Sequence, residues 1–401
     1  MNIYIVPAWY PQDEHDISAC FFREQAHALA DRGHHVTVIH ITPVSCTQAM
    51  RVPWHQRQEW QDGNVRTIFF REIIPLPAKL SHIQDWYISW TFKRIIGNQI
   101  KKDISKGLQP PDLIHAHVSH SCAYYCLMAS RNLKLPLVVT EHYSGLLLGT
   151  ASKEDYERVK KTILGADAFI FVGSNFQKNI CDKMNIKRKT YIIPNMIDTS
   201  RFPELCRKKK EEFTFLTACH LTQNKHVDMV IRAFHNAFSM DETKRLLIAG
   251  DGEELTALQQ LVNELEEESR IHFHGRYSRE EMPELFAQAD AFVLTSKVET
   301  FGIVYLEAMM CGLPCIGTAG QGADDIIDES NGLKVPYGDL ERLAEAMKMI
   351  LEKQEHYNRQ SIRENCSSQF SARTICGSLE SIYAKIKNDI DSEIIEAYSG
   401  D

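Results

Sequence analysis

Short apolar runs rich in β-branched residues alternate with longer amphipathic stretches along the whole chain, a pattern typical of parallel β-sheets flanked by α-helices. The runs predict strands at Ile3–Val6, Val36–Ile41, Val65–Phe70, Leu113–His115, Leu137–Thr140, Ala168–Val172, Tyr191–Ile193, Phe213–Ala218, Leu246–Ala249, Ile271–Phe273, Ala291–Leu294, Cys315–Gly317 and Leu333–Val335. Helical spacing of apolar residues predicts helices at Phe21–Arg32, Tyr156–Leu164, Val227–Phe238, Leu255–Leu265, Met282–Ala289 and Leu340–Leu351.

The alternation is interrupted once, near Pro194-Asn195. A polar segment at Arg201–Glu212 follows, and strand patterning restarts at Phe213. We therefore expect an α/β protein with two Rossmann-like, doubly wound domains facing each other across a cleft. Ligands of such sheets bind at the carboxyl ends of the strands, so we expect the site there.

Charge is distributed unevenly between the halves. The 401 residues carry a net charge of −8, which divides into +6 for residues 1–195 (23 basic against 17 acidic) and −14 for the remainder (22 against 36). An anionic partner is therefore expected at the first half. No dense basic stripe with interleaved aromatic residues occurs, which argues against a nucleic-acid partner.

The eleven cysteines are odd in number and form no Cys-x-x-Cys pair, which indicates reduced thiols and a cytoplasmic location. Five potential zinc ligands do lie close together in the chain. They are His115, His117, His120, Cys122 and Cys126. Because their spacing matches no compact zinc finger, we predict no metal site.

The segment from Ser296 to Pro314 contains the strongest chemical signal. It follows a predicted buried strand and opens a helix, whose first amides, around Phe301-Gly302, are suited to bind an anion. Glu299 precedes that helix, and Glu307 lies one to two turns inside it at about 3.6 residues per turn. Two carboxylates bracketing an anion site suit a diphosphate with hydroxylated rings at both ends. Taken singly, Glu299 is explained by a favourable interaction with the helix dipole, and Glu307 by solvent exposure on the helix.

The Glu-x7-Glu spacing, with Phe-Gly after the first glutamate and Glu-Ala-Met around the second, resembles the retaining glycosyltransferases of family 4, which have the GT-B fold. Further motifs of that family follow in order along nearly the whole chain. They are Trp9-Tyr10-Pro11, Gly33-His34, Asp112–His117, Thr140-Glu141-His142, Ile193–Asp198, Gly250-Asp251-Gly252, His274-Gly275, Gly320-Gln321-Gly322 and Asn331-Gly332.

The resemblance implies an acceptor-binding domain at residues 1–195 and a nucleotide-sugar domain at 196–375. Residues 376–401 would form a helix that returns to the first domain and ends in an acidic tail. In the family, the second glutamate (Glu307) holds the donor ribose and the first (Glu299) contacts the transferred sugar. The amides of Phe301, Gly302 and Ile303 contact sugar and phosphate.

The resemblance also implies which residues neutralise the diphosphate of the donor and which residue approaches the reacting carbon of its sugar. A basic pair, here His220 and Lys225, neutralises the diphosphate, and His142 approaches the donor sugar. The chain departs from the family in three places. His220 replaces the usual Arg, so we expect the diphosphate either to rely more on Lys225 or to draw also on Lys297 or Arg276. Ala19-Cys20-Phe21 lacks the usual Gly. Gln321-Gly322 stands where the family has paired glycines.

The implied activity is the transfer of a sugar, with retention, from a UDP- or GDP-linked donor, without a metal ion or another cofactor. The acceptor would be a lipid-linked or oligosaccharide acceptor in surface-glycan synthesis. Two alternatives remain open at this point: a non-catalytic GT-B subunit that binds sugar nucleotides, and a GT-B nucleotide-sugar epimerase.

Residues 86–106 form a basic amphipathic stretch that is rich in aromatic residues. It resembles a helix that lies on a membrane surface. The enzyme would then work in the cytoplasm at the inner face of the membrane. Alternatively, Trp86, Trp90 and Ile95 pack into their own domain as in an ordinary helix.

Overall fold

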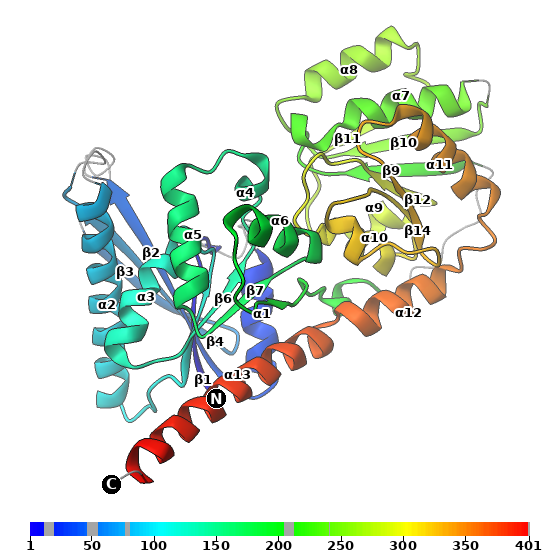
Figure 1. Cartoon of the computed structure of the whole chain (residues 1–401). Helices are drawn as coiled ribbons and strands as arrows, with labels where there is room; N and C mark the ends of the chain where they lie inside the picture. The colour runs from blue at the N-terminus through cyan, green and yellow to red at the C-terminus, as the bar shows by residue number, and fades with distance from the viewer. Residues whose placement is uncertain (12–19, 46–54, 77–80, 204–211, 240, 400–401) are drawn as a thin grey trace. The chain divides into compact units, whose positions relative to one another are not determined.

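The computed structural model describes residues 1–11, 20–45, 55–76, 81–203, 212–239 and 241–399. The chain forms two compact units, each with its own sheet (Figure 1). The first unit comprises Met1–Val172, Asn179–Ile193 and Ile375–Asp401. The second comprises Gly173–Lys178 and Pro194–Thr374.

The sheet of the first unit has the strand order β3-β4-β2-β1-β5-β6-β7-β8. Its strands are β1 (Asn2–Val6), β2 (His35–Ser45), β3 (His55–Asp62), β4 (Val65–Ile74), β5 (Leu113–His117), β6 (Leu137–Glu141), β7 (Ala168–Phe171) and β8 (Tyr191–Ile192). Only β3 runs antiparallel, against β4, among these pairings. Because β2 and β5 flank β1 on opposite sides, the winding of the chain reverses at β1, as in a doubly wound fold.

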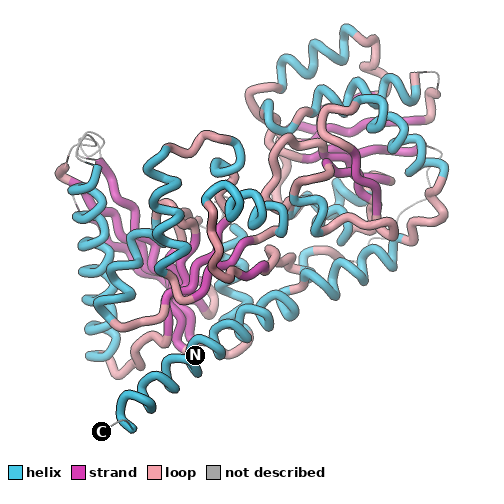
Figure 2. Tube along the Cα trace, in the orientation of Figure 1, coloured by secondary structure: helices cyan, strands magenta, loops and turns pink. Residues whose placement is uncertain are grey.

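Helices cover both faces of this sheet (Figure 2). Helices α2 (Ser81–Ser105), α3 (Cys122–Leu133) and α5 (Lys153–Gly165) pack together, while α1 (Cys20–Asp31) and α13 (Ala372–Ser399) lie on the other side. The short α4 (Gly145–Leu148) follows β6. Helix α6 (Ser174–Met184) begins in the second unit, where the Ser174 amide donates to Asp325 at 2.7 Å.

Helix α13 is an integral part of the first unit. The Arg32 guanidinium at the end of α1 makes two hydrogen bonds with Glu380, of 2.7 and 2.6 Å. Farther along the helix, the buried Tyr383 hydroxyl lies 2.7 Å from Nδ1 of His115. The last helix therefore contacts both the α1 terminus and the central strand β5.

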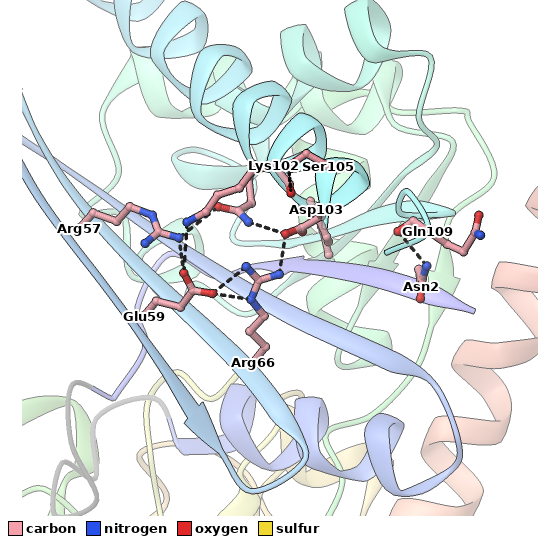
Figure 3. Close-up of polar contacts among 10 residues, drawn as sticks. Asn2, Arg57, Glu59, Arg66, Lys102, Asp103, Ser105 and Gln109 are labelled. Carbon is pink, nitrogen blue, oxygen red and sulfur yellow. Dashed lines mark hydrogen bonds and ion pairs between the residues drawn. The ribbon is translucent and has the colours of Figure 1, made fainter. Parts of the chain in front are cut away.

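Strand β3 is the one described strand that the apolar pattern does not predict. Its sequence, His-Gln-Arg-Gln-Glu-Trp-Gln-Asp, has no apolar alternation, and it pairs with β4 along its whole length. Side chains of β3, β4 and α2 form an ionic network over it (Figure 3): Glu59 pairs with Arg57 and, at 2.7 Å, with Arg66. Arg66 also binds the buried Asp103 of α2 at 2.7 Å.

The sheet of the second unit is wholly parallel, with the order β11-β10-β9-β12-β13-β14. Its strands are β9 (Phe213–Ala218), β10 (Lys244–Ala249), β11 (Ile271–Gly275), β12 (Ala291–Leu294), β13 (Cys315–Thr318) and β14 (Gly332–Val335). Its helices are α7 (Val227–Phe238), α8 (Leu255–Glu264), α9 (Met282–Ala287), α10 (Ile303–Met310), α11 (Leu340–Glu352) and α12 (Arg359–Phe370). Helices α7 and α11 pack together, as do α10 and α12.

The predicted α/β class with two doubly wound parallel sheets is confirmed, and every predicted strand and helix is present with ends shifted by at most a few residues. The expected boundary near Pro194 coincides with a junction between the units. Gly173–Lys178 groups with the second unit, and the first unit resumes at Ile375. Ala19 lies outside the described residues, as does most of the polar segment after Arg201.

Candidate functional site

The predicted donor-site residues of the second unit gather at one edge of its sheet. They lie on loops that follow consecutive parallel strands: Cys219–Lys225 after β9, Gly250–Gly252 after β10, Arg276-Tyr277 after β11, and Ser296–Gly302 after β12. Hydrogen bonds join these loops. Asn224 spans the gap between two of them by donating to the Val298 carbonyl at 3.0 Å and accepting from its amide at 3.1 Å. Asn224 was not predicted, because nothing in its local sequence shows which loop it would contact.

Lys225 and Glu299 form the central pair of this site. The Lys225 ammonium donates to a Glu299 carboxylate oxygen at 2.7 Å, and both side chains are largely shielded from solvent. Burial disfavours the charged amine, but the charge of Glu299 and its hydrogen bond outweigh burial, so the pKa of Lys225 is raised above its usual value. A positive charge is thus held permanently at the edge of the sheet.

The backbone of Glu299 is fixed by the segment that departs from the family pattern. Its amide donates to the Gln321 side chain at 3.1 Å, and its carbonyl accepts from the Gly322 amide at 2.9 Å. Gln321 therefore takes part in shaping the loop that carries Glu299. A glycine at position 321 would have no side chain to accept from the Glu299 amide, so this departure from the family's glycine pair supplies one of the two contacts.

The predicted anion site lies at the start of α10. Gly302 precedes the helix with a φ of 95°, a left-handed conformation that disfavours other residues. A Cβ at this position would also come within 2.6 Å of the Tyr305 ring. Helix geometry leaves the first amides, including that of Ile303, without partners inside the helix. Phe301 is fully buried, and its ring packs on Phe370.

Glu307 is half-buried inside α10 and lies close to Tyr277, on the loop after β11. Burial, followed by the charge of Glu307, raises the pKa of Tyr277 above its usual value. An aromatic ring beside a carboxylate is an arrangement that suits a nucleoside, because the ring can stack on a base while the carboxylate accepts from ribose hydroxyls.

The predicted His220 and Arg276 meet at Asp251. Nδ1 of His220 contacts the Asp251 carbonyl oxygen at 2.6 Å, and Nε of Arg276 lies 2.7 Å from the Asp251 carboxylate. The loops approach closely because Gly250 has no side chain: a Cβ there would lie 1.9 Å from the Cys219 carbonyl oxygen. The Arg276 side chain is 85% exposed and so remains accessible to an anion.

His142 belongs to the first unit and stands directly after β6. Its backbone amide and that of Tyr143 donate to the buried Glu141 carboxylate at 2.8 and 2.7 Å. The other Glu141 oxygen accepts from the amide and hydroxyl of Ser119. Glu141 thus shapes the loop that carries His142, a role that sequence patterning did not predict.

No group of three His, Cys, Asp or Glu side chains in the described parts of the chain is arranged to hold a metal ion. The cysteines among these residues are all free thiols. Cys122 and Cys126, which the sequence placed near three histidines, are buried in α3, and Cys122 Sγ contacts the Val6 carbonyl oxygen.

Helix α2 exposes a stripe of large apolar side chains. Ile83, Trp86 and Trp90 are 52%, 59% and 40% exposed, whereas Ile95 is buried. The alternative in which both tryptophans pack into their own domain is therefore wrong, although Ile95 does so. Among the described helices, none is both long enough and apolar enough to span a bilayer.

Two family models together match most of the chain: "Glycosyltransferase Family 4" over residues 21–201 and "Glycosyl transferases group 1" over 198–365. The chain is 26% identical over 291 residues to N-acetyl-α-D-glucosaminyl L-malate synthase of Bacillus anthracis, covering 69% of this chain and 76% of that enzyme. It is 23% identical over 294 residues to α-monoglucosyldiacylglycerol synthase of Streptococcus pneumoniae, covering 65% of each. The Anabaena HepE structure with UDP superposes with a TM-score of 0.70 at 16% identity, covering 96% of this chain and 100% of HepE. These matches and the two doubly wound sheets show that the chain belongs to glycosyltransferase family 4 and has the GT-B fold.

Proposed function

We propose that this glycosyltransferase moves a sugar, with retention of configuration, from a UDP- or GDP-linked donor that binds at the edge of the second sheet. The observation that carries the proposal is the Lys225–Glu299 pair beside the open start of α10. A diphosphate would meet the Lys225 ammonium and the amides of Gly302 and Ile303. Glu299 would then turn to hydroxyls of the transferred sugar.

Charge development explains why these groups suit the reaction. Breaking the bond between the anomeric carbon and the phosphate oxygen leaves negative charge on the diphosphate and an oxocarbenium-like sugar. Preorganised donors aimed at the leaving oxygen stabilise that charge as it forms. The acceptor hydroxyl attacks from the face that the diphosphate leaves, forms the new glycosidic bond, and transfers its proton to the departing phosphate.

In the proposed donor site, positive charge would come from side chains and helix amides. Lys225, Arg276, His220 and the start of α10 are the groups available to a diphosphate. We propose that these groups substitute for a metal ion and that the enzyme turns over without one. The test is activity that persists in the presence of excess EDTA.

The proposed acceptor is lipid-linked. The exposed stripe Ile83, Trp86 and Trp90 on α2, with Lys93 and Lys101 on the same helix, suits the interface of an anionic membrane. The name of one relative, α-monoglucosyldiacylglycerol synthase, also points to a lipid product. The enzyme would then act in the cytoplasm as a peripheral protein on the inner face of the membrane, in surface-glycan synthesis.

Calorimetric titration of the purified chain with UDP, GDP, ADP and their sugar conjugates tests the donor site. Binding of one base, strengthened by one sugar, would support the proposal and identify the donor. Detection of the released nucleoside diphosphate with diacylglycerol, lipid-linked sugars and L-malate as acceptors then tests transfer. Donor binding without transfer to any acceptor would favour a non-catalytic sugar-nucleotide subunit, and interconversion of free sugar nucleotides would identify an epimerase.

A further inference from the structure

A cavity opens in the first unit at the amino ends of its parallel strands, which is the edge of the sheet opposite to the one that carries His142. Its volume of about 410 Å³ lies within the range of roughly 300–1,000 Å³ that is typical of small-molecule sites. The end of α2 and the turn at residues 107–109 form part of its lining. Four neighbouring strands contribute one register row of side chains: Tyr4, Thr37, Arg66 and Gln61.

The charged side chains of the lining, Arg66 and Asp103, already neutralise each other. The Arg66 guanidinium lies 2.7 Å from the buried Asp103 carboxylate and 2.7 Å from that of Glu59, so it is held between two carboxylates (Figure 3). Asp103 also accepts from the Tyr4 hydroxyl at 2.6 Å and from the Gln99 side chain at 2.8 Å. A charged ligand would therefore have to displace an existing ion pair, whereas a neutral ligand would not.

The uncharged polar groups of the lining keep hydrogen-bonding capacity for a ligand. In the described parts of the chain, the Thr37 hydroxyl and the Gln109 carboxamide have no hydrogen-bond partner. The Asn2 side chain donates to the Gln109 backbone carbonyl at 3.0 Å, and the Gln61 side chain donates to the Gly63 carbonyl at 3.0 Å. The side-chain oxygens of Asn2 and Gln61 have no partner among these same residues. The cavity thus offers both donors and acceptors.

Apolar side chains complete the lining. Val36 and Leu108 both contribute, and Leu108 is 50% exposed. A saccharide matches this mixture, because each hydroxyl can donate and accept while the ring carbons present C–H groups to apolar side chains. A nucleobase matches it less well, since Tyr4 is only 4% exposed and its ring offers no open face for stacking.

We propose that this cavity binds a neutral saccharide unit, at a site that shares no residue with the proposed donor site. The five-residue strands β5 and β6 separate the two edges of the sheet by roughly 15 Å, at about 3.3 Å per residue. A saccharide bound here is therefore remote from His142 and is not the sugar that would react. The proposal uses only contacts within the first unit and does not rest on the proposed function.

NMR spectra of the full chain, ¹⁵N-labelled at glutamine and threonine, report on this cavity directly. The side-chain amide signals of Gln61 and Gln109 are assigned by their loss in the corresponding alanine variants, and the backbone amide signal of Thr37 by its loss in Thr37→Val. The probes are maltose, cellobiose, lactose and N,N′-diacetylchitobiose, each added up to about 50 mM so that a Kd in the millimolar range is detected. We expect at least one disaccharide to shift the three signals saturably.

Glycerol, uridine and inorganic phosphate are the comparison ligands, and none of them should shift the same signals saturably. Failure of all four disaccharides to shift these signals would overturn the proposal. A saturable response to any comparison ligand that equals the response to the disaccharides would also overturn it, because the cavity would then select a nucleoside, an anion or any small polyol.

Variants show whether the lining groups make the contacts. Gln61→Ala combined with Gln109→Ala should weaken disaccharide binding, measured on the Thr37 signal, by about 10-fold, because each change removes a hydrogen-bonding group. Gln58→Ala is the matched control: Gln58 is an exposed glutamine of the same strand, and its side chain lies on the opposite face from Gln61. Undiminished binding in the double variant, or an equal loss in Gln58→Ala, would refute the proposal. If the double variant does not fold, Thr37→Val, which removes only the hydroxyl, decides.

The titrations also separate this proposal from the proposed function. Lys225→Gln should leave disaccharide binding at the cavity unchanged, because Lys225 belongs to the second unit. A chain that binds a disaccharide here but transfers no sugar would support the cavity and refute the transferase proposal. Sugar transfer by a chain whose cavity signals respond to no disaccharide would do the reverse.

Discussion

The Lys225 ammonium lies 2.7 Å from the Glu299 carboxylate, and this ion pair joins the loops that follow β9 and β12. The pair has two consequences. It holds the Lys225 charge in a partly buried position before any donor binds. It also fixes the side chain of Glu299, whose backbone is held separately by hydrogen bonds with Gln321 and Gly322.

Lys225→Gln should lower kcat by about 100- to 1,000-fold, the range measured when one preorganised donor to a developing negative charge is removed. Stopped assays of nucleoside diphosphate release would measure it. Lys348→Gln is the control, since Lys348 is an exposed lysine of α11 that belongs to none of the loops of the candidate site. Equal losses in the two variants would show that Lys225 acts only through net charge.

Glu299→Gln and Glu307→Gln should affect different kinetic steps. Glu307 lies beside Tyr277, so its loss should weaken binding of the bare nucleotide by about 10- to 100-fold, as expected for a hydrogen bond to a charged group. Glu299→Gln should retain nucleotide binding and lose turnover. Calorimetry with the nucleotide and assays with the sugar donor would distinguish the two, and the reverse assignment would contradict the site.

Arg276→Gln should weaken donor binding by about 10-fold or less, because an exposed charge is screened by solvent and salt. His220 and Arg276 contact the same residue, Asp251, so an arginine at either position reaches the same region. His220→Arg in the Arg276→Gln background should therefore recover binding. If the effects of Arg276→Gln and His220→Arg on donor binding simply added in a double-mutant cycle, the two basic groups would act independently, and this prediction would be contradicted.

Glu380 should make the stability of the first unit depend on acid pH. Hydrogen bonds from Arg32, against a smaller opposing effect of burial, lower the pKa of Glu380 to about 2, compared with 4.5 in the unfolded chain. Its stabilising contribution is therefore complete above about pH 4.5 and is lost as the pH falls toward about 2. Urea unfolding between pH 5 and 3 should show a shallower decline in Glu380→Gln, and the exposed Glu355→Gln should behave like wild type.

Trp86→Ser with Trp90→Ser should reduce binding to vesicles that contain anionic lipid by about 10-fold or more, because burying a large apolar side chain contributes roughly 1.5–3 kcal/mol. Cosedimentation measures this binding. Nucleotide binding should be unchanged, since α2 belongs to the first unit. Met349→Ser, which removes an exposed apolar side chain of α11, is the control. Undiminished vesicle binding in the double variant would contradict a membrane role for α2.

Periodicity predicted thirteen strands of these two sheets because each contains a short apolar run, and strands such as β5, β6, β9 and β12 are buried along their whole length, as central parallel strands require. It failed at β3, whose polar residues are held by the ladder with β4 and by ion pairs among Arg57, Glu59 and Arg66. The sequence of such a strand shows no apolar periodicity, because the residues that stabilise it lie elsewhere in the chain.

The candidate site likewise combines features that the sequence predicts with contacts that it does not. Motif spacing predicts a role for Glu299, Glu307 and Gly302, because they lie on one continuous segment. It could not identify the contacts of Asn224 with Val298 or of Gln321 with Glu299, since each joins loops from different strands. The contact of His117 with His142, whose ring nitrogens lie 3.2 Å apart, likewise depends on β5 and β6 being neighbours in the sheet.

The last helix has a consequence for engineering this enzyme. Residues Pro194–Thr374 form the body of the second unit, and Ile375 onward belongs to the first, as Tyr383 and Glu380 show by their contacts with His115 and Arg32. In terms of chain order, the second unit is an insertion within the first, not a downstream module. Exchanging the second unit, with its proposed donor site, between relatives therefore calls for an internal graft with two splice points. A chimera joined at a single crossover near Pro194 would bring a foreign α13 to the first unit's own α1 and β5.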